Sequence, residues 1–216
     1  MEKLKAVKTI RATAKMQMGP GMEFPGVLIV KRPDEARMEF TVQGLTAVQA
    51  YDGKTAWQVM PFMGKKDPEV MTVDEQKEME EQADMDGSIV DYKSKGNQVE
   101  LVGKEKVEGA DAIKLKVTLK NGDVKYVYLD ADNYLEVKEQ TKRTIRGSEQ
   151  EIEATMGDYK EVEGVMMAFS FQGAIKGHEE KQIITIDKIE VNIPVEDALF
   201  KMPPPAPKPA ADTPKN

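Results

Sequence analysis

Apolar and polar residues alternate along most of the chain, which is typical of antiparallel strands with one buried and one solvent-facing side. The clearest run places Ile113, Leu115 and Val117 between lysines and a threonine. Turn signals separate the runs, and Asn121-Gly122 is the sharpest because both residues tolerate the positive φ of a tight hairpin. The pattern predicts about eleven strands, mostly joined in sequence, in a large curved sheet. Two of them are expected to be long, over 135–146 and 165–176.

One helix is expected in the middle of this series of strands. Thr72 and Glu75 have the spacing of a capping box, so the sequence predicts a helix over 72–84. Met79 and Ala83 lie one turn apart on one face of that helix, and its opposite, outer face is strongly acidic.

A sheet with one apolar face has to cover that face, either by closing into a barrel or by curling around a helix. We therefore expect a single, mainly β domain over residues 1–202, with the helix over 72–84 as its plug or lid. Residues 2–7 match the last turns of a further helix. Residues 203–216 contain six prolines and are expected to form a disordered tail.

The composition excludes several kinds of chemistry. The 216 residues include no cysteine and one histidine, His178, which excludes disulfides, thiol catalysis and a histidine-rich metal site. A net charge of -7 argues against nucleic acid, and no run of about 20 apolar residues is present to span a membrane. The pairs Asp84/Asp86 and Asp130/Asp132 adjoin turns and are expected to be solvated. We expect no catalytic residue, no metal and no cofactor.

Methionine is unusually frequent, with 14 residues against 6 Phe, 6 Tyr and 1 Trp. An unbranched, polarisable side chain suits a surface that accepts variable ligands, although it also fills gaps in an ordinary core. Methionines gathered on the concave face beneath the helix over 72–84 would indicate a pliable pocket.

A series of short motifs points to a family. They are Val30-Lys31-Arg32-Pro33 at a strand end, Asp52-Gly53-Lys54-Thr55, Trp57, Pro61-Phe62 and the closing Phe200-Lys201-Met202-Pro203-Pro204. In this order and spacing they resemble the LolA family of periplasmic lipoprotein carriers, also called outer membrane lipoprotein-sorting proteins. The resemblance spans roughly residues 7–204.

The resemblance implies an unclosed antiparallel β-barrel of about eleven strands with a helical lid. The cavity between barrel and lid receives acyl chains, and the proteins work in the periplasm after removal of a leader. The chain itself shows no signal peptide, so a cytoplasmic protein is the other interpretation of its location.

Arg32 is the sharpest candidate residue. In the family, the arginine of the Lys-Arg-Pro run hydrogen-bonds the lid backbone and holds the cavity shut, so the resemblance implies that Arg32 is the lid latch. The alternative is an exposed, idle arginine at a strand end. Arg37 is expected to point outward into solvent, because Met38 and Phe40 take the apolar face.

Cavity-lining, acyl-binding residues are expected among the large apolar side chains near the lid. For each of them, ordinary core packing is the alternative. The candidates are Met16, Met18, Met38, Phe40, Trp57, Met60, Phe62, Met79, Met167 and Phe169.

The leading functional hypothesis is a monomeric, non-catalytic carrier that binds the acyl chains of lipoproteins or lipids for transfer towards the outer membrane. An inner-membrane exporter and an outer-membrane acceptor would be its partners. The first alternative is a periplasmic sensor or regulatory domain of the same fold that binds a lipid or a protein such as an anti-sigma factor. The second is an enzyme, for which the sequence shows no constellation.

Overall fold

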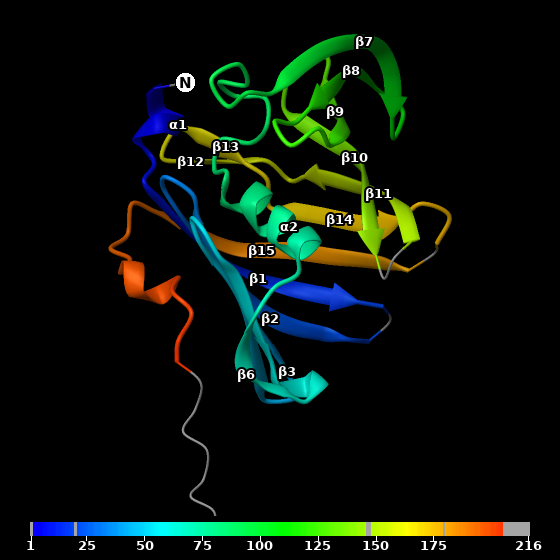
Figure 1. Ribbon diagram of the computed structural model, residues 1–216. Helices are drawn as coiled ribbons and strands as arrows, with labels where there is room; N and C mark the ends of the chain where they lie inside the picture. Colours follow the sequence, from blue (N-terminus) through cyan, green and yellow to red (C-terminus); the bar gives the residue numbers. More distant parts are fainter. Residues whose placement is uncertain (1, 20, 146–147, 179, 205–216) are drawn as a thin grey trace, which may run out of the picture.

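The computed structural model describes residues 2–19, 21–145, 148–178 and 180–204, and Figure 1 shows them as one curved, open sheet around a central helix. Thirteen antiparallel strands form the sheet. They are β1 (Thr9–Met18), β2 (Glu23–Lys31), β3 (Glu35–Val42), β4 (Leu45–Asp52), β5 (Ala56–Met60), β6 (Lys65–Val70), β7 (Gln98–Val107), β8 (Ala110–Thr118), β9 (Val124–Asp130), β10 (Glu136–Ile145), β11 (Ser148–Gly157), β14 (Ser170–Ile175) and β15 (Lys181–Val191).

The remaining elements are short. Strands β12 (Lys160–Val162) and β13 (Val165–Met167) form a separate hairpin. The helices are α1 (Glu2–Ala6) and α2 (Val73–Ala83), with two single 3-10 turns, η1 (Pro61–Met63) and η2 (Asp197–Leu199). No helix in the described ranges is both long and apolar enough to cross a membrane.

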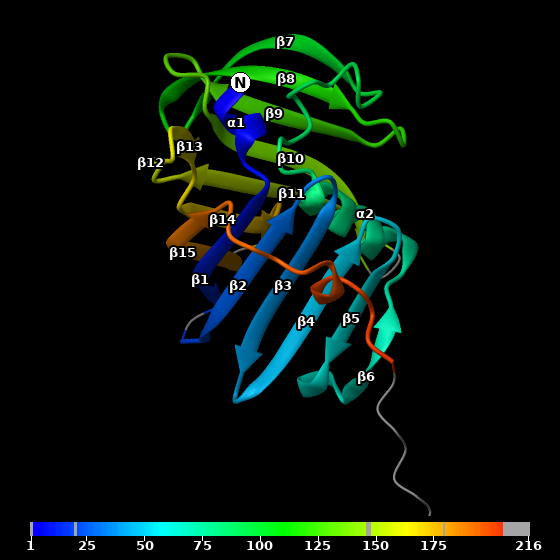
Figure 2. The ribbon, with the colours of Figure 1, turned by 90° about the vertical axis from the view of Figure 1, so that its left-hand side faces the viewer.

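The order of strands explains where the lid lies. From one edge to the other the sheet runs β6 to β1, then β15 and β14, then β11 to β7. The two ends of the chain therefore meet in the middle of the sheet, where β1 pairs with β15. The free edges are β6 and β7, and residues 71–97 connect them. This lid segment has to pass across the opening of the curve, and Figures 1 and 2 show α2 lying there.

The expected open, antiparallel sheet is confirmed, but the strand count differs. The segment expected as one strand over 165–176 is broken between β13 and β14, at Ala168 and Phe169. Strand β6 has the sequence Lys-Lys-Asp-Pro-Glu-Val, which shows no apolar alternation. It lies at the sheet edge. Pro68 has no backbone N–H to donate to a neighbouring strand, and an edge strand tolerates this because it has a neighbour on one side only.

The helix expected over 72–84 is present as α2, with Thr72 as its N-cap. The capping box is complete: the Glu75 carboxylate accepts from the Thr72 backbone N–H at 2.8 Å, and Thr72 Oγ1 accepts from the Glu75 N–H at 3.4 Å. Residues 2–6 form α1, as expected for the N-terminal segment. The proline-rich tail lies outside the described residues from position 205 onward.

The concave face of the sheet carries the apolar core. One cluster joins the lid to the first half of the sheet and consists of Ala36, Tyr51, Ala56, Met71, Met79 and Ala83. A second cluster lies near the middle of the sheet and consists of Ala12, Ala14, Phe169 and Ile186, with Leu28, Met167 and Phe171 packed against it. The concave face therefore carries two packed clusters, of which the first lies against α2.

Candidate functional site: the lid and the concave face

Arg32, at the end of β2, hydrogen-bonds two separate parts of the chain, the N-terminal segment and the loop after α2. Its Nε donates to the Val7 carbonyl at 2.7 Å and its NH2 group to the Leu4 carbonyl at 3.1 Å. The same guanidinium donates to both oxygens of Asp86, at 2.7 and 2.5 Å. Asp86 lies just after α2, so Arg32 joins the C-terminal end of the lid helix to β2 and to the end of α1.

Asp86 was not foreseen as a partner, because its place beside a turn favoured a solvated carboxylate. Its side chain is only 11% exposed. The hydrogen bond from Arg32 holds the pKa of Asp86 below its usual value, and burial opposes this shift. A bidentate pair of this kind is geometrically specific, since only a planar guanidinium offers two parallel donors. Asp84 is likewise paired, with Lys95 at 2.5 Å.

A second set of charges joins the lid to the other half of the sheet. Glu81 of α2 accepts from Lys125 of β9 at 2.9 Å and from Arg143 of β10 at 2.8 Å. Lys125 also pairs with Glu139 of β10, at 3.0 Å. The acidic face of α2, expected to point outward, thus turns one carboxylate inward onto the sheet.

These four groups, Glu81, Lys125, Glu139 and Arg143, form the buried ion cluster. Burial alone would raise the pKa of Glu81, but Lys125 and Arg143 outweigh it and hold that pKa below its usual value. Burial would lower the pKa of Lys125, and Glu139 and Glu81 reverse the shift and raise it. Glu81, Lys125 and Arg143 are therefore charged around neutral pH, and each has an opposite charge within reach.

A polar groove lies beside this cluster. Its volume is about 770 Å³, and it runs between α2, the loop after it and the strands β9 and β10. Glu136 lines the groove. Its burial, with a smaller contribution from repulsion by Glu139, raises the pKa of Glu136 to about 7. Among the described residues, no three His, Asp or Glu side chains gather as metal ligands would.

The first half of the sheet carries the apolar wall. Strand register places Met16, Met38, Phe40 and Met60 on the same face as Ala36 and Ala56, which α2 covers. Met79 reaches this face from α2. Met16 packs over Gly26 of the neighbouring strand so closely that a Cβ at Gly26 would lie 2.7 Å from the Met16 sulfur.

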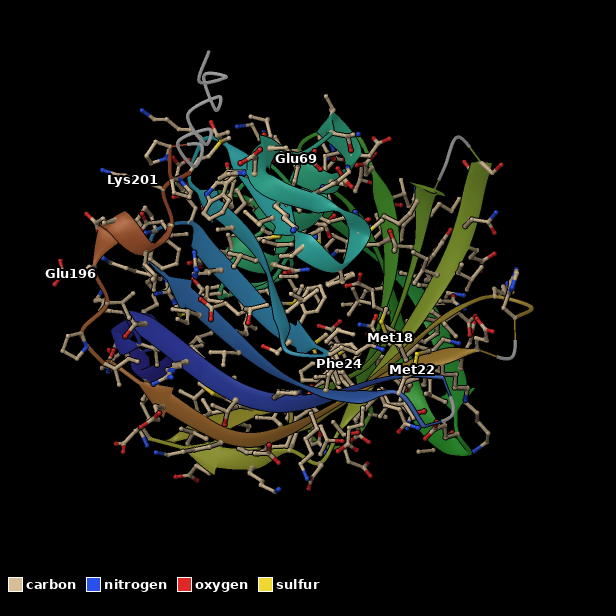
Figure 3. The ribbon with its side chains drawn as sticks, turned by 90° about the horizontal axis from the view of Figure 1, so that it is seen from below. Met18, Met22, Phe24, Glu69, Glu196 and Lys201 are labelled. Atoms are coloured by element: carbon tan, nitrogen blue, oxygen red, sulfur yellow. The ribbon has the colours of Figure 1, made fainter. Side chains whose placement is uncertain are left out.

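The apolar wall continues to the open end of the sheet. The rings of Phe24, Phe40 and Phe62 follow one another with centroids 5.8 Å apart at each step. Beyond them Met18 and Met22 are exposed at the tip of the β1–β2 hairpin, and Figure 3 shows both beside Phe24. They also line a cavity of about 430 Å³ with Ile152 and Ile175. Of the methionines, Met71 and Met79 thus pack in the α2 cluster, and Met18 and Met22 lie exposed at the rim.

Trp57, one of the expected lining residues, lies on the other face of the sheet. It neighbours Ala56 in β5 and therefore points to the opposite, outer face of the sheet. There its Nε1 donates to the Phe200 carbonyl at 2.7 Å, and Phe200 itself is fully buried. Trp57 packs under the C-terminal segment, away from the lid. The expectation erred because the largest apolar side chain was assigned to the cavity without regard to strand phase.

Arg37 shares this outer face, as expected, but it is not solvated. It donates to Glu39 at 2.7 Å and to the Leu199 carbonyl at 2.8 Å, and it lies 5.8 Å from the Trp57 ring. The C-terminal segment is thus fixed by side chains that face away from the lid.

Met167 and Phe169 are part of the second cluster, where Phe169 packs with Ala12 and Ala14. The Lys160 ammonium lies 4.4 Å from the Phe169 ring centroid, which is a cation–π distance. These two residues belong to packed core at some distance in the fold from the α2 cluster.

No known protein family and no curated protein matches the sequence. Three solved structures share the fold over nearly the whole of both chains. A DUF1329 family protein from Desulfovibrio piger is 12% identical, with 93% of this chain and 92% of that chain covered and a TM-score of 0.68.

The other two structures have a TM-score of 0.63 each. A domain named for outer membrane lipoprotein sorting, from Vibrio parahaemolyticus, is 13% identical with 89% of both chains covered. A LolA superfamily protein from Nitrosomonas europaea is 10% identical with 90% of both chains covered. At such identities the likeness establishes a shared architecture, and the chain therefore has the open, lidded β-barrel fold of LolA-like and DUF1329 proteins.

Proposed function

We propose that the protein is a non-catalytic carrier that binds the acyl chains of lipoproteins or lipids on its concave face. One observation carries the proposal: α2 covers part of the apolar concave face, and charged side-chain contacts, which water can replace, help to hold the helix there. The same face also carries Met16, Met38 and Met60.

Burial of apolar surface supplies the binding energy. Each methylene that leaves water contributes about 0.8 kcal/mol, so two long chains would bind too tightly to be released without an opposing cost. Displacing the lid supplies that cost, because it exposes Met79 and Ala83 and separates Arg32 from Asp86. In this scheme Arg32 is the lid latch, and methionine side chains adapt to chains of different shape.

We further propose that the protein acts outside the cytoplasm, in the periplasm. The lipoprotein-sorting name of one structural neighbour supports this. Transfer between an exporter and an acceptor in the two membranes would be the corresponding biological step.

Titration with a fluorescent acyl probe tests the proposal. The wild type should bind the probe with saturation, and Arg32→Leu should take it up and release it faster because the lid is held less firmly. Arg11→Leu is the matched control, since Arg11 is an exposed arginine of the same sheet. The absence of saturable binding would contradict the carrier, and equal rates for both variants would remove Arg32 from its mechanism.

A further inference from the structure

The lid helix has two unlike interfaces. Towards β3, β4 and β5 it is apolar, with Met79 and Ala83 almost fully buried against Ala36, Tyr51 and Ala56. Towards β9 and β10 it is charged, because the contacts there are those of the buried ion cluster.

The two interfaces also differ in how close the helix comes to the sheet. The backbone of α2 runs alongside β2 to β5. Its connection to β9 and β10 is made by the long side chains of Glu81, Lys125 and Arg143. Lys125 is only 8% exposed, Arg143 18% and Glu81 21%, so these charges are largely shielded from water while the lid is closed.

Parting these interfaces has different consequences in water. Separating the apolar side exposes hydrocarbon, and each Å² exposed is unfavourable by about 25 cal/mol. Separating the charged side hydrates the buried Lys125 and the partly buried Glu81 and Arg143, which recovers the desolvation penalty of their burial and offsets the lost Coulomb attraction. The charged interface is therefore the one that separates more easily when the lid opens.

We propose that α2 opens first along β9 and β10 while it stays docked on β3 to β5 and Asp86 stays bound to Arg32. An acyl chain then reaches the concave face through the gap between α2 and β10, and complete displacement of the lid follows when the Arg32 contact breaks. This direction of opening rests on the proposed carrier function for its ligand, but the motion itself occurs in the ligand-free protein.

Spin labels can follow the motion directly, because the chain has no cysteine and introduced pairs are labelled without background. Gln82 on α2 is exposed, as are Lys142 on β10 and Lys54 in the β4–β5 turn. The pair at 82 and 142 spans the charged side, and the pair at 82 and 54 spans the apolar side. Distance distributions are measured without ligand, with a saturating fatty acid, and in the variant Glu81→Gln.

The distribution between 82 and 142 should shift to longer distances with the fatty acid, and it should broaden without ligand in Glu81→Gln and at high salt. The distribution between 82 and 54 should keep its maximum throughout. Glu80→Gln, an exposed carboxylate on the same helix, is the matched control and should resemble the wild type.

Lengthening between 82 and 54 with a constant 82–142 distance would overturn the proposal, as would two unchanged distributions in a protein that binds the fatty acid. A protein that binds no fatty acid contradicts the carrier function instead. In that case the ligand-free comparison of Glu81→Gln with the wild type still decides the direction of opening.

Discussion

Arg32 and Asp86 are 54 residues apart in sequence and are joined by two hydrogen bonds of 2.7 and 2.5 Å. The pair brings the end of the lid helix to the end of β2, where Arg32 also binds the carbonyls of Leu4 and Val7. One side chain therefore fixes the lid, the N-terminal helix and the sheet with respect to one another.

The Arg32–Asp86 pair should contribute to stability. We expect Asp86→Asn to lower the free energy of unfolding by about 1–3 kcal/mol, since it weakens hydrogen bonds that involve two charged groups. Denaturant unfolding measures the change, with Asp132→Asn as an exposed control. Because the pKa of Asp86 is lowered in the folded state, its contribution is present above the ordinary carboxylate pKa and is lost as the pH falls through the lowered one. An equal effect of both variants would contradict the role of the pair.

The fluorescence of the single tryptophan should respond to changes in the C-terminal segment and not to movement of the lid. Trp57 emission should keep its maximum when a non-fluorescent fatty acid binds, because Trp57 points away from α2. Phe200→Ala should shift the emission to longer wavelength and lower the free energy of unfolding by about 3–5 kcal/mol, since Phe200 is fully buried beside the indole. A large shift of the emission on ligand binding would place Trp57 at the ligand after all.

Met79 should anchor the lid through packing. It is fully buried, so Met79→Ala should lower the free energy of unfolding by about 2–5 kcal/mol. Met79→Leu keeps the volume and should cost less than about 1.5 kcal/mol. Val73→Ala, at a side chain that is 76% exposed on the same helix, is the control for helix propensity. A small effect of Met79→Ala would mean that α2 is not held by its apolar face.

Glu136 should make stability depend on pH near neutrality. Its folded pKa is raised to about 7 from an ordinary 4.5, so the unfolded chain ionises first and the folded state is disfavoured as the pH rises between these values. Glu136→Gln removes this penalty. The variant should be more stable than the wild type by on the order of 3 kcal/mol at about pH 8, and the two should converge near about pH 4. A constant difference across this range would show that Glu136 does not titrate as described.

The sequence is sufficient to predict those features that local periodicity encodes. The capping box at Thr72 predicted α2 to within a residue at either end, and the alternation in residues 113–117 predicted β8. Strand β6 was missed because an edge strand with Pro68 and four charged residues has no apolar period. The direction in which Trp57 points was missed because the alternation in β5 shows that Ala56 and Trp57 face opposite sides, but not which side α2 covers.

The charges beneath the lid lay beyond what a single sequence shows. Glu81 meets Lys125 and Arg143 only because the fold brings β9 and β10 within side-chain reach of α2, 44 and 62 residues further along the chain. Nothing in the local pattern distinguishes Glu81 from the exposed carboxylates around it. The same is true of Asp86, whose partner Arg32 follows β2, 54 residues earlier in the chain.

The carrier function is tested most directly by the lipid content of the protein itself. Protein purified from its native envelope should release an acyl-bearing lipid or lipopeptide in about stoichiometric amount when it is denatured and extracted for mass spectrometry. Arg32→Leu should retain less of this ligand through the same purification, and Arg11→Leu should retain as much as the wild type. A lipid-free wild type that also takes up no acyl probe would contradict the account.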